Sequence, residues 1–374
     1  MNRIAPCVVL AALAGPVSMA KADLPILRLW PGGDFPCDTT LQACVSGANP
    51  GDRIRIETDG PIDESIAFSK SLALTAQAGF HPVFSAGRSI TATTASMGAY
   101  SIRIEGLTLA QGTISVTQSS ASPMSVDVVS NTVSNGSSSP SAKAIELDCV
   151  GGAGAVAFEV SGNTVTIDGS ANALQLHLPS GSHGSIDNNS IAMGSNQGGV
   201  GISIEELGPR PLSADVIANR ISGTAYVDGI NIFGVAGVRL LDNLIIGQAS
   251  TGVPTGAVVL HAFLGAIDAT VVNNTITGNG TGIAAWPENA TTVSGLVANN
   301  IVSGNETGIS IPAVTATTTL ENRDNLVFGN GADSFTPDRA PSRKIRTSQA
   351  PTTTTCSRGR RPSTPATTLR FPPI

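Results

Sequence analysis

The sequence contains few aromatic and few charged residues. Of its 374 residues, 4% are Phe, Trp or Tyr and 13% are Asp, Glu, Lys or Arg. No apolar run after the N-terminus is long enough to predict a transmembrane segment. The five Cys and four His include no Cys-x-x-Cys pair and no cluster that would indicate a zinc site. The sequence also shows no phosphate-binding glycine loop in a strand-helix context and no nucleophile elbow.

The residues that are abundant favour β structure. The chain contains 41 Gly and many Ser, Thr, Asn, Val and Ile, a composition typical of short strands and tight turns. A hydrophobic content of 41% supplies enough apolar surface for a core and excludes wholesale disorder.

Residues 1–22 have the pattern of a secretory signal peptide. Arg3 precedes the apolar stretch VVLAALAGPV, and Ala20-Lys21-Ala22 has the form of a cleavage site. We therefore expect export to the periplasm, the cell surface or the medium. An oxidising compartment would permit a Cys37–Cys44 disulfide. The alternative, that Cys44 only packs against the core, stays open.

An asparagine motif, Asn-x-Ile or Asn-x-Val, recurs along the chain. Its spacing is 24 to 32 residues, and its positions are Asn131, Asn163, Asn189, Asn219, Asn243, Asn274, Asn300 and Asn325. A second element recurs between them, with the sequences AIEL, ALQL, GISI, GINI and GIAA. Each unit therefore holds at least two short alternating strands.

Units this short cannot bury an apolar face alone, so we expect them to stack about 4.8 Å apart. Alternation turns the apolar residues of the second element inward, as in Ile145/Leu147, Ile202/Ile204, Ile230/Ile232 and Ile309/Ile311. The repeated Asn is expected at a turn, where it tolerates a left-handed backbone and can hydrogen-bond from coil to coil. Gly106 takes the position of this Asn in an earlier coil.

The units NNTITGNGTGI and NNIVSGNETGI, with the segment CDTTLQACVSGANPGDRIRIET, carry a family resemblance. The sequence resembles the right-handed parallel β-helix proteins of the pectin-lyase-like superfamily over about residues 35–335. The resemblance implies an all-β solenoid of about ten coils with a short N-terminal capping helix. We assign residues 23–60 to the cap and residues 61–335 to the β-helix. Function does not follow, because this superfamily includes lyases, hydrolases and adhesins.

Residues 336–374 differ in chemistry, with eight Lys or Arg against one acidic residue. A basic tail could bind an acidic glycan or nucleic acid. We favour a frameshift instead, because a GC-rich back-translation read one nucleotide out of phase resembles the usual ending of bacterial β-helix repeat proteins. On this interpretation the tail is disordered and Cys356 has no role.

Functional side chains are expected on the outward face just after the second recurring strand. This column reads Asp148, His177, Glu205, Phe233, His261, Trp286 and Pro312. Its neighbour reads Glu146, Gln175, Ser203 and Asn231. Acids and His at one end could act on a polysaccharide, with Asp148 and Glu205 about 10 Å apart. Aromatic residues at the other end could stack on sugar rings. The competing interpretation is that outward positions beside turns are simply polar.

Two functions stay open. The first is an exported surface or matrix protein that contacts polysaccharide or another cell-surface macromolecule through Phe233, His261 and Trp286. The second is a polysaccharide lyase or glycoside hydrolase that uses Asp148, His177 and Glu205. Gly181-Ser182-His183 matches a hydrolase motif only loosely and is expected in a turn. No cofactor motif is present, and calcium stays open without an acidic cluster to support it. We expect a monomer with no nucleic-acid partner. A degraded gene product without a retained role is a third interpretation.

Overall fold

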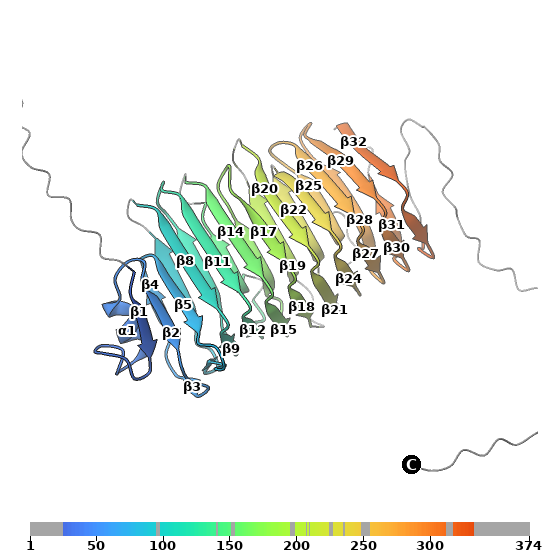
Figure 1. Cartoon of the computed structure of the whole chain (residues 1–374). Coiled ribbons are helices and arrows are strands. Elements are labelled where there is room, and N and C mark those ends of the chain that lie inside the picture. Colours follow the sequence, from blue (N-terminus) through green and yellow to red (C-terminus); the bar gives the residue numbers. More distant parts are fainter. Residues whose placement is uncertain are drawn as a thin grey trace, which may run out of the picture.

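The part of the chain that the structure describes forms a solenoid of three parallel β-sheets with one short helix at its N-terminal end (Figure 1). The computed structural model describes residues 25–94, 98–139, 141–150, 154–194, 199–206, 208, 210–223, 227–234, 236–247, 255–311 and 317–332. The predicted signal peptide, the basic tail and Pro312 lie outside these ranges. No helix in the described part of the chain is long and apolar enough to span a membrane.

Strands are contributed to the three sheets in rotation, and every pairing is between strands of successive coils. Sheet A contains twelve strands: β1 (Leu27–Trp30), β2 (Arg53–Ile56), β5 (Leu72–Ala76), β8 (Tyr100–Glu105), β11 (Met124–Val129), β14 (Val156–Ser161), β17 (His183–Asp187), β20 (Leu212–Ile217), β23 (Ala236–Leu241), β26 (Ile267–Val272), β29 (Thr292–Ala298) and β32 (Thr317–Arg323). Sheet B contains eleven strands: β3 (Pro61–Ile62), β6 (Val83–Phe84), β9 (Thr108–Leu109), β12 (Thr132–Asn135), β15 (Thr164–Ile167), β18 (Ser190–Met193), β21 (Arg220–Gly223), β24 (Leu244–Ile246), β27 (Thr275–Thr277), β30 (Ile301–Ser303) and β33 (Leu326–Phe328).

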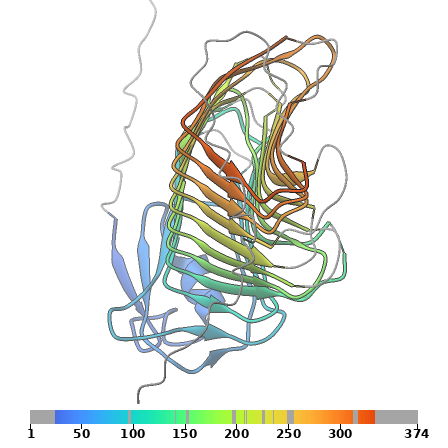
Figure 2. The same ribbon diagram turned by 90° about the vertical axis from the view of Figure 1, so that its right-hand side faces the viewer.

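Sheet C contains ten strands: β4 (Ile66–Phe68), β7 (Ile90–Thr94), β10 (Ile114–Gln118), β13 (Lys143–Asp148), β16 (Asn172–His177), β19 (Val200–Glu206), β22 (Asp228–Gly234), β25 (Gly256–Ala262), β28 (Thr281–Pro287) and β31 (Thr307–Ser310). Ten complete coils therefore run from β2–β4 to β29–β31, and Figure 2 shows them stacked one above another. The predicted parallel β-helix of about ten coils is confirmed.

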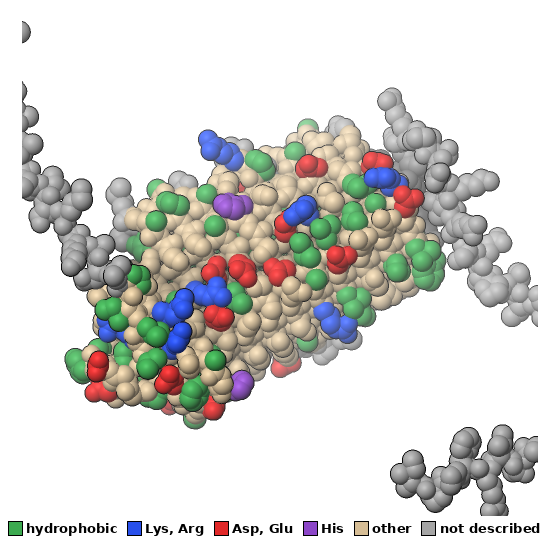
Figure 3. Space-filling model, viewed as in Figure 1, with side chains coloured by type: hydrophobic (Ala, Val, Ile, Leu, Met, Phe, Trp, Pro, Cys, Tyr) green, Lys and Arg blue, Asp and Glu red, His purple; other side chains and the backbone are tan. Residues whose placement is uncertain are grey.

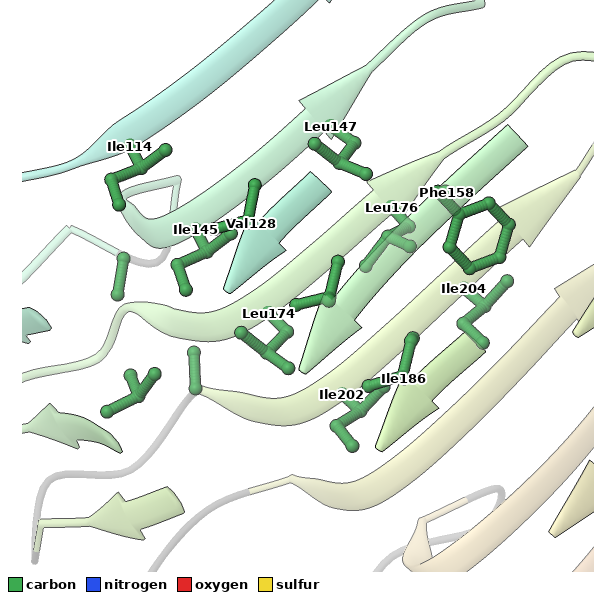
Figure 4. Close-up of a cluster of buried hydrophobic side chains, with 14 of the residues drawn as sticks. Ile114, Val128, Ile145, Leu147, Phe158, Leu174, Leu176, Ile186, Ile202 and Ile204 are labelled. Atoms are coloured by element: carbon green, nitrogen blue, oxygen red, sulfur yellow. The ribbon is translucent and has the colours of Figure 1, made fainter. Parts of the chain in front are cut away.

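The core consists of inward side chains stacked in columns (Figure 4). Ile145, Leu174 and Ile202 lie directly opposite one another on three successive strands of sheet C, and each is fully buried. Burying each such side chain stabilises the fold by about 1.5–3 kcal/mol. The inward placement predicted for the alternating Ile and Leu residues is observed in this sheet.

The repeated asparagines form an unbroken ladder at the turn between sheets A and B. From Asn131 to Asn325, each Asn side-chain amide donates to the side-chain oxygen of the next Asn, over 2.9 to 3.1 Å. The left-handed backbone, however, belongs to the preceding residue, as at Ser130 and Asn273. The expectation that the ladder Asn itself is left-handed was wrong.

The same one-residue offset corrects the prediction that Gly106 takes the position of the ladder Asn in an earlier coil. Thr108 pairs with Thr132, so Leu107, not Gly106, occupies the ladder position, and the Leu107 amide donates to the Asn131 side chain over 3.0 Å. Gly106 takes the left-handed position instead. A buried side chain that must reach the next coil and a left-handed backbone are two separate requirements, met by adjacent residues.

Helix α1 (Leu41–Gly47) closes the N-terminal end of the core, where Leu41 and Val45 are fully buried. The Thr40 side chain accepts from the Ala43 amide, and the Glu64 carboxylate accepts from the Leu41 and Gln42 amides at 2.7 and 2.9 Å. These bonds satisfy donors that a helix leaves free at its first turn. A disulfide joins Cys37, just before the helix, to Cys44 within it.

Candidate functional site

Six predicted site residues lie in one continuous row on the outer face of sheet C. The register pairs each with the next, in the order Asp148, His177, Glu205, Phe233, His261 and Trp286. Each follows an inward residue and is half-buried, so strand alternation turns all six outward. Neighbours in this row, the sheet C row, are separated by about 4.8 Å of backbone.

The acidic end of the row is built around His177. Its Nε2 lies 2.9 Å from Glu205 Oε2, and its Nδ1 lies 3.8 Å from Asp148 Oδ1. Gln175 and Ser203 belong to the neighbouring outward column. The Gln175 amide lies 2.6 Å from His177 Nε2, and the Ser203 hydroxyl donates to Glu205 Oε1 over 3.1 Å. The two columns therefore form one hydrogen-bonded group.

This geometry changes the protonation of the pair. The hydrogen bond to Glu205 raises the pKa of His177, and the charges of Glu205 and Asp148 add to this effect against burial and Lys143. Burial raises the pKa of Glu205, but the hydrogen bonds and charge of its partners, above all His177, outweigh burial and lower it. Both shifts favour the imidazolium form of His177 and the carboxylate form of Glu205.

The other end of the row is an aromatic cluster. The Phe233 and His261 rings meet edge to face at 4.8 Å, and Phe263 stacks on Phe233 at 5.4 Å. Glu288 links Trp286 to His261, since its Oε1 accepts from Trp286 Nε1 over 2.8 Å and lies 3.1 Å from His261 Nε2. The Trp286 hydrogen bond contributes most to lowering the pKa of Glu288.

Phe263 and Glu288 were missed by the reasoning from sequence. They follow the row residues His261 and Trp286 by two positions, just beyond the ends of β25 and β28. Extending the alternation by two residues past each row residue would have found both. At the acidic end, the described residues two positions past Asp148 and His177 are Val150 and Pro179, and neither carries a polar or aromatic side chain.

Other predicted features lie apart from the row. His183 starts β17 on sheet A, so its expected position in a turn was wrong. Among the residues that the structure describes, no three His, Cys, Asp or Glu side chains are grouped so that they could hold a metal ion.

The row combines two chemical capacities. The imidazolium and carboxylate at one end can donate and accept hydrogen bonds and can exchange a proton. The aromatic end presents partly exposed ring surface, which stacks on flat apolar faces such as those of sugars. The row is therefore suited to an extended ligand with both hydroxyl groups and apolar faces.

Comparison with known proteins gives only a weak likeness in structure. No protein-family model matches the chain, and no curated protein matches it. Among solved structures, pectate lyase Pel9A aligns at 12% identity with a TM-score of 0.41, covering 83% of this chain and 79% of the lyase.

Proposed function

We propose that this β-helix binds polysaccharide along the sheet C row. The main observation in support is that the outward residues follow one another on successive strands without a gap. Acids and His177 lie at one end, and Phe233, His261 and Trp286 lie at the other. The aromatic end stacks on sugar rings, and the acidic end forms hydrogen bonds with sugar hydroxyls. The polysaccharide belongs to a cell-surface or extracellular matrix, in keeping with the expected export of the chain.

The aromatic cluster supports this proposal because its members hold one another in place. Glu288 fixes the Trp286 indole by a hydrogen bond, and Phe263 stacks on Phe233. A ring that is already immobilised loses little conformational entropy when a sugar stacks on it.

The test is binding to a panel of neutral and uronic-acid polysaccharides, measured by affinity electrophoresis and calorimetry. We expect Trp286→Ala and Phe233→Ala each to weaken binding at least tenfold. Phe328→Ala is the matched control, because Phe328 is an exposed aromatic on sheet B, 39% accessible. Loss of affinity in the control alone, or binding that both row variants leave unchanged, would refute the proposal.

Catalysis is a second candidate function, favoured by the contact of His177 with Glu205 beside Asp148. The protonated His177 would supply the acid, and a carboxylate of the row would act as base. New reducing or unsaturated ends released from a polysaccharide would reveal turnover. We expect His177→Asn and Glu205→Gln to abolish it, and Glu159→Gln on sheet A to leave it intact. Binding without turnover would restrict the row to recognition.

A further inference from the structure

A hollow lies on the outer face of sheet A, at the N-terminal end of the solenoid. Two adjoining depressions of about 700 and 550 Å³ share Arg53, Arg55 and Arg103. No residue of the sheet C row lines either depression. Lys and Arg side chains gather toward this end of the face in Figure 3. We call these two depressions together the sheet A hollow. The ligand considered for it is separate from the polysaccharide proposed to bind the sheet C row.

The hollow exists because small side chains separate larger ones. Ala73 and Thr75 on β5 lie directly above Arg53 and Arg55 on β2, and Arg103 and Glu105 on β8 lie above them in turn. The floor is therefore two coils wide, about 10 Å. A wall at one end comes from the six residues 77–82 between β5 and β6, where the later ladder coils have only two residues.

The charges around the hollow are unbalanced. Within the described part of the chain, the guanidinium groups of Arg53 and Arg55 form no ion pair or hydrogen bond. Arg103, by contrast, is bonded to Glu105 at 2.8 Å and to Asp127 at 2.9 Å. Two like charges on the same face of one short strand repel each other, and the three arginines of the hollow outnumber its two carboxylates, Glu105 and Asp127.

The floor also carries an unused polar group. Thr75 is 93% buried, since 7% of it is accessible, and it lines the hollow. Its hydroxyl makes no hydrogen bond with any residue that the structure describes. Because Thr75 lines the hollow and its hydroxyl has no partner among the described residues, the hydroxyl can donate to a ligand there.

We propose that the sheet A hollow binds a tetrahedral oxyanion, a phosphate or sulfate group, held by Arg53, Arg55 and Thr75. Guanidinium groups donate paired hydrogen bonds to such groups, and those of Arg53 and Arg55 have no ion-pair partner among the described residues that would compete with the anion. The Thr75 hydroxyl donates the further bond from the floor. The anion is either free or carried by a larger molecule, and the shared chemistry is the oxyanion group itself.

Calorimetric titration with inorganic phosphate and inorganic sulfate, against chloride at equal ionic strength, tests the proposal. We expect saturable binding that weakens at least tenfold in Arg53→Gln/Arg55→Gln. Arg220→Gln is the matched control, because Arg220 is another exposed arginine, on sheet B, without an ion pair among the described residues. Circular dichroism and thermal unfolding confirm that each variant is folded.

Two further arms identify the source of the oxyanion and separate this site from the row. A sulfated polysaccharide that binds where its desulfated form does not would show a carried group, whereas binding of the inorganic ions alone would show a free anion. In both cases, binding is expected to require Arg53 and Arg55. Trp286→Ala is expected to leave anion binding unchanged, so failure of the row proposal does not affect this one. The absence of saturable binding, or equal losses in the arginine pair and Arg220→Gln, overturns the proposal.

Discussion

At the residue scale, His177 sets the charge of the acidic end, because its two ring nitrogens face Glu205 and Asp148. The raised pKa of His177 gives a stabilising contribution that is complete below its ordinary value of 6.5 and is lost as the pH rises through the raised value. The lowered pKa of Glu205 gives a contribution that is complete above its ordinary value of 4.5 and is lost on acidification. The pair therefore stabilises the fold most between these two values.

We predict that Glu205→Gln moves the titration of the His177 imidazole back toward an ordinary histidine value, measured by NMR. The same variant should unfold about 1–2 °C lower than the parent in the window between pH 4.5 and 6.5, because a partly exposed pair contributes on the order of 1 kcal/mol. The difference should shrink as the pH rises above that window.

The control for this prediction is His183→Gln, which removes an exposed histidine from sheet A and leaves the row intact. Its unfolding temperature should follow the parent across the same pH range. An unchanged His177 titration in Glu205→Gln would mean that the ion pair does not determine the protonation of the row.

The sequence predicts the row and not the hollow, and the reason lies in particular residues. Ile145, Ile202 and Ile230 must point inward. The third residue after each of them therefore points outward, and these outward residues make up the row, so the row follows from spacing alone. Phe263 and Glu288 lie past the strand ends, where no repeated pattern marks them. The hollow depends on Ala73 and Thr75 being short beside Arg53 and Arg55, which appears only when neighbouring coils are in register.

At the element scale, α1 closes the end of a solenoid that would otherwise expose its core. Gln42 also exchanges two hydrogen bonds with the Ala67 backbone on β4, at 2.7 and 3.0 Å. The helix thus covers the edge of the first strand of sheet C, and an uncovered edge is a site for pairing with other chains. Glu64 anchors this arrangement because its carboxylate binds the first turn of the helix.

We predict that Glu64→Ala destabilises α1 by about 1–2 kcal/mol, since two amides lose a charged acceptor. Hydrogen exchange followed by mass spectrometry should show faster exchange in Leu41–Gly47 and little change in the central coils. Glu306→Ala, which removes an exposed carboxylate near the other end of the solenoid, should leave α1 unchanged. Equal exchange in Glu64→Ala and the parent would show that Thr40 alone caps the helix.

At the scale of the whole molecule, each coil is supported only by the coils next to it. In such a stack the cost of a defect depends on how many neighbours the defect touches. Ile202, Ile230, Val258, Ile283 and Ile309 lie in one inward column of sheet C. Ile202 has a strand on either side, whereas β31, which carries Ile309, is the last strand of sheet C in the described structure.

This column allows the same substitution to be compared at two places in the stack. We predict that Ile202→Ala lowers the free energy of unfolding by about 2–5 kcal/mol, because the cavity is closed by coils above and below. Ile309→Ala should cost less than half as much, and hydrogen exchange should confine its effect to β31 and the neighbouring strands β28 and β30. Urea unfolding of both variants gives the comparison. Equal losses would show that the solenoid unfolds as a single unit in which position along the axis does not matter.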